Sequence, residues 1–152
     1  MTGLLTLEDI RVILIAGLTC GTLDITCTAT LNWLRGIEPM RTLQGVASGI
    51  LGPKSFAGGR GTAALGLGLH FFIALAFTSA YYFASRKLNV LNEHAVVCGL
   101  LYGIAVHLFM SFVVVPLSSV KRPFSMAFFA IQFPVHMLFV GLPISLIVRH
   151  FS

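Results

Sequence analysis

Four long apolar stretches, separated by short breaks that carry charge, dominate the hydrophobic pattern of this chain. A helix rises about 1.5 Å per residue, so roughly 20 apolar residues cross the hydrocarbon core of a bilayer. Amphipathic aromatic residues favour the headgroup level, and Trp33, Tyr81 and Tyr82 lie at the ends of the first two stretches. The pattern therefore predicts four transmembrane helices, at residues 10–34, 61–85, 95–117 and 125–148.

The connections between these stretches are short, and every backbone polar group in lipid must be paired within its own segment. Both facts favour a single transmembrane domain over residues 1–152, folded as an all-α, antiparallel four-helix bundle. Pro134 and Pro143 lie within the fourth predicted helix, on either side of His136. Because each proline removes one helix hydrogen bond, we expect this helix to kink beside His136 and to open a small cavity there.

The longest break contains a shorter helical pattern at residues 40–51. Apolar residues recur there at helical spacing, at Met40, Leu43, Ala47, Ile50 and Leu51. Arg41, Gln44 and Ser48 fall on the other side of such a helix. This pattern predicts a short amphipathic helix that lies on the membrane surface, with the three polar residues toward water.

Composition agrees with a chain whose solvent is mostly lipid. Hydrophobic residues make up 57% of the 152 residues and charged residues 10%, against roughly 45–50% and 25% in soluble domains. The mean hydropathy is +0.92. These values exclude a soluble globular protein, a disordered chain, a nucleic-acid-binding domain and a secreted disulfide scaffold. The odd number of cysteines, all within apolar stretches, indicates reduced packing residues at Cys20, Cys27 and Cys98.

The net charge of +5 lies almost wholly in the breaks, which suits contact with anionic lipid headgroups. The breaks on one predicted side hold six basic residues: Arg35, Arg41, Lys54, Arg60, Lys121 and Arg122. Those on the other side hold four: Arg11, Arg86, Lys87 and Arg149. Since basic loops stay on the cytoplasmic side, this difference favours both termini outside.

The glycine-rich residues 52–61 precede the second long helix. Free backbone amides at a helix start can bind a phosphate group or a lipid headgroup, and Arg41, Lys54 and Arg60 lie in or near this segment. The sequence therefore predicts a lipid or anion site at these three basic residues. The alternative interpretation is a simple flexible hinge, because the segment has no Walker pattern.

Each predicted transmembrane helix carries one ionisable residue near its middle. These residues are Asp24, His70, His107 and His136. If the helices alternate in direction, they lie roughly 21, 20, 18 and 17 Å from the amino-terminal side. Small residues on the same helix faces, such as Gly21, Gly66 and Gly103, indicate that these side chains point at neighbouring helices. Because ionisable groups are costly in hydrocarbon, the sequence predicts a functional Asp–His–His–His cluster at the midplane.

Several roles fit such a cluster. Two histidines on facing helices can be the axial ligands of a b-type haem, and three imidazoles with a carboxylate can instead bind a transition metal ion. The cluster can also relay protons without a cofactor, because histidine titrates near neutral pH. A purely structural alternative is that each histidine fixes helix register through a hydrogen bond. Met110 and Met137, close to two of the histidines, are either soft ligands or core filler.

The sequence contains no nucleophile elbow, HExxH motif or pair of carboxylates within the membrane, so an ordinary enzyme is not indicated. The competing class is a non-catalytic accessory or structural subunit of a larger respiratory, photosynthetic or transport complex. The small size and the glycine-rich helix faces suit packing against other subunits. The expected partners are membrane lipids and either other membrane subunits or further copies of this chain, and no nucleic acid.

A series of residues in the last two thirds of the chain has a recognisable order and spacing: His70, Tyr82, Leu91, Gly99, Gly103, His107, Pro116, Leu117 and His136. In this order the chain resembles the YagU-like family of small bacterial inner-membrane proteins, mainly over residues 61–150. That family carries a histidine in each of its second, third and fourth helices, the third shortly before a Pro-Leu pair. The resemblance implies a multi-pass protein of the bacterial inner membrane in which the three histidines matter. Asp24 departs from the family, where a basic residue is expected.

Overall fold

The computed structural model describes residues 5–152, which are helical apart from short turns and connections. Among these residues, four helical stretches are long and apolar enough to cross a membrane: Leu7–Leu34, Gly59–Ser85, Ala95–Leu117 and Met126–His150. The all-helical class and the four long apolar helices predicted from the sequence are thus confirmed, with ends that move by three residues or fewer.

The individual helices follow one another in a simple order. The first half contains α1 (Leu7–Leu34), α2 (Pro39–Leu51), the short 3₁₀ helix η1 (Gly52–Ala57) and α3 (Gly59–Ser85). After the single turn α4 (Val90–Glu93), the third long stretch consists of α5 (Ala95–Phe109), η2 (Met110–Val114) and α6 (Val115–Leu117). The fourth consists of α7 (Met126–Val135), η3 (His136–Gly141) and α8 (Leu142–His150).

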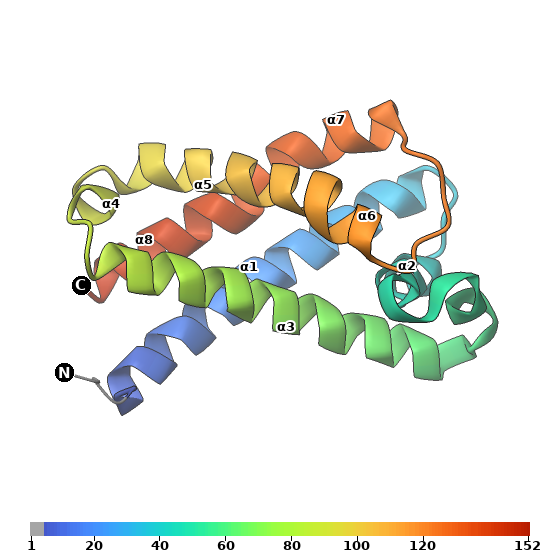
Figure 1. The fold of residues 1–152 in the computed structure, drawn as a ribbon, viewed down its shortest axis with the longest axis horizontal. Helices are drawn as coiled ribbons and strands as arrows, with labels where there is room; N and C mark the ends of the chain where they lie inside the picture. The colour runs from blue at the N-terminus through green and yellow to red at the C-terminus, as the bar shows by residue number, and fades with distance from the viewer. Residues whose placement is uncertain (1–4) are drawn as a thin grey trace.

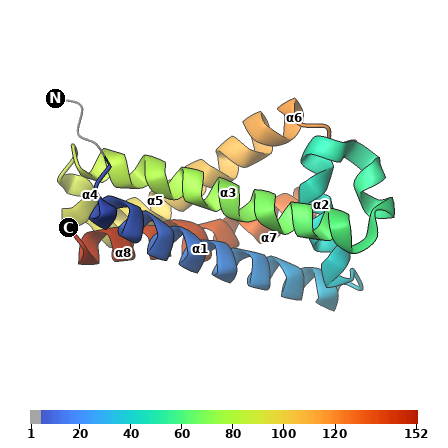
Figure 2. The same cartoon turned by 90° about the horizontal axis from the view of Figure 1, so that it is seen from below.

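The short helix α2 lies at one end of the molecule, whereas the amino-terminal end of α1 and the carboxyl-terminal end of α8 lie at the other (Figures 1 and 2). Helix α1 crosses α3 at two glycines. A Cβ atom at Gly17 would meet Leu75, and one at Gly21 would meet Phe71. Residue numbers rise along α1 as they fall along α3, so the two helices run in opposite directions where they cross.

The third and fourth long stretches approach each other most closely at glycines. A Cβ atom at Gly99 would overlap Ser145, and one at Gly103 would overlap the backbone of His136. Gly141 is just as close to α5 from the other side, since a Cβ atom there would overlap the backbone of Gly99. Small residues allow helix backbones to touch, and here they hold the backbone of His136 directly against α5.

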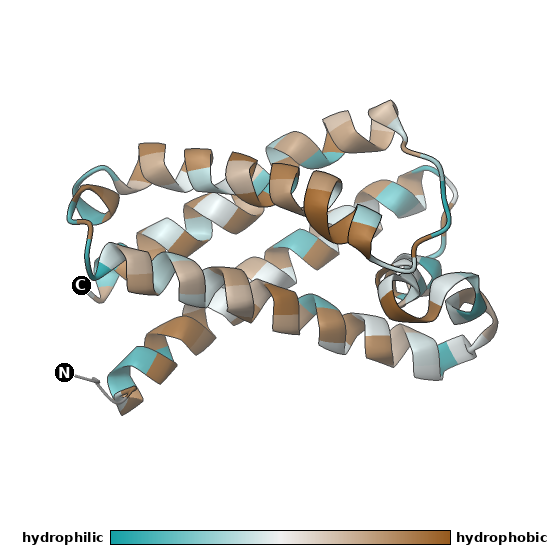
Figure 3. Ribbon diagram, in the orientation of Figure 1, coloured by the Kyte–Doolittle hydropathy of each residue, from teal (hydrophilic) through white to brown (hydrophobic). Residues whose placement is uncertain are grey.

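Hydrophobic residues make up most of the four long stretches, and hydrophilic residues are commoner toward their ends and in the connections (Figure 3). Phe72, Leu101 and Phe112, for example, are large apolar side chains that are well exposed. Soluble monomers rarely expose apolar patches of such extent. The outer surface is therefore the one expected of helices that face lipid.

Two of the long stretches contain a π-helical segment two residues before a proline. Segment η2 ends at Val114, just before Pro116, and η3 ends at Gly141, just before Pro143. Proline lacks an N–H group and its ring crowds the carbonyl four residues earlier, so the helix widens upstream of it. In the fourth helix, for which the sequence predicts a kink, the departure from α-helical geometry is this π-helical segment, which begins at His136 itself.

Helix α2 is confirmed as a helix, but its polar side is not where the sequence pattern places it. Gln44 is only 2% exposed, and its Nε2 donates to the carbonyl of Gly59 at 3.0 Å. Ser48 is also buried, whereas Ile50 is 59% exposed. The prediction that Gln44 and Ser48 face water is wrong, because Gln44 finds polar partners at the start of α3 and the Ser48 hydroxyl donates to the carbonyl of Gly45 within α2. Arg41 is exposed as predicted.

Candidate functional site

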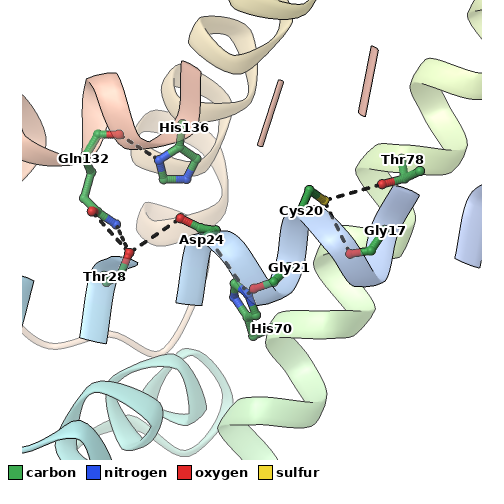
Figure 4. A network of polar contacts seen from close by, with 9 residues as sticks. All are labelled: Gly17, Cys20, Gly21, Asp24, Thr28, His70, Thr78, Gln132 and His136. Atoms are coloured by element: carbon green, nitrogen blue, oxygen red, sulfur yellow. Dashed lines mark hydrogen bonds and ion pairs between the residues drawn. The ribbon is translucent and has the colours of Figure 1, made fainter. Parts of the chain in front are cut away.

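Asp24 and His70 form one polar pair in the middle of the molecule, between α1 and α3 (Figure 4). His70 Nε2 lies 4.0 Å from Asp24 Oδ2 and donates a hydrogen bond to the carbonyl of Gly21 at 2.8 Å. The two helices can come this close because Gly21 has no side chain and Phe71 fills the space beside it. The pair therefore lies at the α1–α3 crossing.

His107 and His136 form a second pair, between the third and fourth long stretches. Their ring centroids are 4.9 Å apart. His107 belongs to α5, and His136 is the first residue of η3. Gly103 lies one turn before His107 and receives the backbone of His136, so the glycine contact between the helices sets the distance between the two rings.

Thr28 and Gln132 link the two pairs (Figure 4). Gln132 Nε2 donates to Thr28 Oγ1 at 3.1 Å, and Thr28 Oγ1 donates to Asp24 Oδ1 at 3.5 Å. The backbone carbonyl of Gln132 accepts from His136 Nδ1 at 2.9 Å. Because a carbonyl only accepts, His136 Nδ1 carries the hydrogen, and in the neutral ring Nε2 holds the free lone pair.

The His107 side chain is buried among aromatic rings. It is 3% exposed, and its ring centroid lies 4.5 Å from that of Phe129 and 5.6 Å from that of Phe133. Its Nε2 atom has no hydrogen-bond partner among residues 5–152. A buried polar atom without a partner costs about 1–3 kcal/mol. A ligand that bonds to His107 Nε2 would remove this free-energy cost, so this atom is the strongest candidate contact for a ligand in the site.

The four predicted site residues thus come together as two pairs rather than as one set. His70 turns its Nε2 toward Gly21 and Asp24, while His107 and His136 face each other across another helix contact. Within the described part of the chain, no three His, Cys, Asp or Glu side chains are grouped so that they could hold one metal ion. A ligand shared by all four residues would need a rearrangement of the helices.

The spacing of the His107–His136 pair distinguishes between ligands. Two imidazoles on opposite sides of one haem iron need ring centroids about 6 Å apart, given metal–nitrogen bonds of about 2.0 Å. Two imidazoles at the corners of a tetrahedral metal site need about 5 Å. The observed 4.9 Å fits the second arrangement and is too short for a haem between these two rings.

The three residues of the predicted lipid or anion site lie at the α2 end of the molecule and are all exposed: Arg41, Lys54 and Arg60. The guanidinium carbon of Arg41 lies 5.5 Å from the ring centroid of Phe56. Gly52 and Gly59, on either side of this segment, have φ angles of 61° and 58°. Glycine adopts such positive φ angles without strain, and these two residues turn the chain before and after η1.

Sequence reasoning did not assign a role to Thr28, Gln132 or Phe129. Gln132 and His136 are four residues apart, so their shared helix face is visible in the sequence. The pairing of Gln132 with Thr28 joins residues 104 positions apart and has no sequence signal. Phe129 is one of 13 phenylalanines, and nothing in the pattern distinguishes it from the others.

Comparison with protein-family models, with characterised proteins and with solved structures finds no match for this chain. The resemblance to the YagU-like family stays a prediction.

Proposed function

We propose that this chain is a multi-pass protein of the bacterial inner membrane, folded as an antiparallel four-helix bundle, that binds a divalent transition-metal ion between His107 and His136. Four long apolar helices support the membrane assignment. The resemblance noted in the sequence supports the bacterial inner membrane. The metal site rests on one observation above all, the buried Nε2 atom of His107 that has no partner among residues 5–152.

Three further features support a metal ion as the ligand. Imidazole is a common ligand of zinc, copper, iron and nickel. The 4.9 Å between the rings suits two ligands of one tetrahedral ion. The hydrogen bond from His136 Nδ1 to a backbone carbonyl is the usual way in which a ligating histidine is oriented, since it leaves Nε2 free for the metal.

The polar residues around the pair act as positioning residues. Gln132 holds His136 through its carbonyl, Thr28 holds the Gln132 side chain, and Asp24 accepts from Thr28. This chain of hydrogen bonds ties the fourth helix to α1. Two protein ligands leave further positions on the metal open to water or to an incoming small ligand, which suits an ion that exchanges or reacts.

A proton relay is less well supported by the same residues. A path for protons across a membrane must run from one face to the other, whereas Asp24, His70, His107 and His136 all have similar predicted depths. The links between the pairs also run through the side chain and carbonyl of Gln132, an amide that does not titrate. The similar predicted depths therefore favour a site at one level of the membrane over a path across it.

The proposal is tested by the metal content of untagged protein, purified in mild detergent from cells supplied with zinc and copper. We expect close to one transition-metal ion per chain in the wild type and a loss of at least tenfold in His107→Phe and in His136→Phe. The matched control is His150→Phe, since His150 is exposed at the end of α8. Metal-free wild-type protein, or equal metal in all four proteins, would contradict the proposal.

A further inference from the structure

An open apolar groove lies on the surface between α1, α2 and α3, with a volume of about 320 Å³. Apolar side chains from all three helices line it: Ile25, Ala29, Trp33, Pro39, Leu43 and Leu67. Trp33 is 65% exposed, and tryptophan favours the boundary between hydrocarbon and headgroups. The apolar lining of the groove therefore suits an acyl chain, and Trp33 indicates that the groove lies close to the headgroup level of the proposed membrane.

The exposed face of α2 and η1 also carries apolar side chains. Because Gln44 and Thr42 bond inward, to Gly59 and Asn32, the helix turns apolar residues outward instead. The exposed apolar side chains here are Met40, Ile50, Leu51 and Phe56. An outward apolar face on a helix whose polar side is already satisfied by the protein indicates contact with lipid rather than with water.

The net positive charge of the protein is concentrated at this same end. The connections at the α2 end hold six basic residues, Arg35, Arg41, Lys54, Arg60, Lys121 and Arg122, against one acidic residue, Glu38. The opposite end holds four basic and three acidic residues, namely Arg11, Arg86, Lys87, Arg149, Glu8, Asp9 and Glu93. At that opposite end, Arg86 Nη1 lies 3.6 Å from Asp9 Oδ1, so the two charges partly neutralise each other. The electrostatic match to an anionic surface is therefore at the α2 end.

From these three observations we infer that the α2 end binds anionic phospholipid, with an acyl chain in the groove at Trp33 and the headgroup phosphate at Arg41, Lys54 and Arg60. Each basic residue near an anionic membrane surface strengthens binding about fivefold. The cytoplasmic leaflet is the more anionic one, so the same contact orients the protein with its α2 end toward the cytoplasm. This inference is independent of the metal site.

The single tryptophan of the chain makes a direct test available. Protein is reconstituted in vesicles that contain equal amounts of phosphatidylglycerol and phosphatidylcholine, with bromine on the acyl chains of one lipid at a time, and quenching of Trp33 is measured. We expect brominated phosphatidylglycerol to bind near Trp33 at least fivefold more strongly than brominated phosphatidylcholine. Equal quenching by the two lipids would overturn the inference, and so would no quenching by either.

Substitutions locate the headgroup contact. Arg41→Gln, Lys54→Gln and Arg60→Gln, singly and combined, should each reduce the preference for phosphatidylglycerol, by about fivefold for each residue that reaches the phosphate. The matched control is Lys87→Gln with Arg149→Gln, which removes exposed basic residues at the opposite end. A preference that the three substitutions leave unchanged, or that the control removes equally, would overturn the assignment. The single variants keep the test valid if the combined variant does not fold.

Discussion

The ring of His107 lies 4.9 Å from that of His136, where α5 meets the first residue of a π-helical segment. The His107 ring has a buried nitrogen without a partner among the described residues, and the His136 ring is held by a hydrogen bond to the carbonyl of Gln132. A π-helical turn is rare and is often found at functional sites. At the His107–His136 pair, the buried nitrogen of His107, an oriented second imidazole and a π-helical turn therefore occur together.

Replacing His107 by phenylalanine should separate its binding role from its packing role. The change removes a buried polar atom without a partner while keeping a ring among Phe129 and Phe133, so we expect no loss, and a gain of up to about 1 kcal/mol, in the stability of metal-free protein. Stabilisation by added Zn²⁺ should disappear. Thermal unfolding in detergent, with and without zinc, measures both. Strong destabilisation of the metal-free variant would mean that His107 is mainly a structural residue.

Replacing Gln132 by leucine should weaken metal binding without removing a ligand. The side chain of Gln132 donates to Thr28, and without this contact the turn that carries His136 is less well held. Loss of a residue that orients a metal ligand typically costs 10–100-fold in affinity, and Thr28→Val should have a similar effect. The control is Thr30→Val, whose hydroxyl bonds only to the carbonyl of Thr26 on the same helix. Equal zinc affinity in all variants would show that Gln132 and Thr28 do not position His136 for metal binding.

Gly103→Ala tests whether the close approach of the helices sets the histidine spacing. The added Cβ would overlap the His136 carbonyl and Met137, so α5 and the fourth helix must move apart. We expect a loss of about 1–3 kcal/mol in stability together with weaker metal binding. Gly68→Ala is the matched control, because open space surrounds that position and alanine favours helix by about 1 kcal/mol. Similar stability of the two variants would show that the Gly103 contact is not tight.

The optical spectrum should show no bis-histidine haem. The His107 and His136 rings are closer than two axial ligands of one haem iron require. Dithionite-reduced protein should therefore lack a sharp absorption band at about 560 nm. An absorption spectrum from the near-ultraviolet to the red, recorded oxidised and reduced, measures this. A band that His107→Ala removes would show that the helices part to admit a haem, and would restore that interpretation.

Hydropathy and helix geometry were sufficient to predict the four long apolar helices. The arrangement of the candidates into two pairs was not predictable, because it depends on which neighbour each helix face meets. His70, for example, reaches the carbonyl of Gly21, a backbone atom that no side-chain pattern reveals. Helix α2 shows the same limit. Its apolar repeat predicted the helix correctly, but the inward direction of Gln44 depends on partners at the start of α3.

The central claim, that His107 and His136 bind one metal ion together, is tested most directly by pulsed electron paramagnetic resonance of untagged protein loaded with one equivalent of Cu²⁺. This method counts the imidazole nitrogens coupled to the copper. We predict two coordinated imidazoles in the wild type, at most one in each of His107→Phe and His136→Phe, and two in His150→Phe. A wild-type spectrum without coordinated imidazole, or one that neither substitution at the pair alters, would contradict the claim.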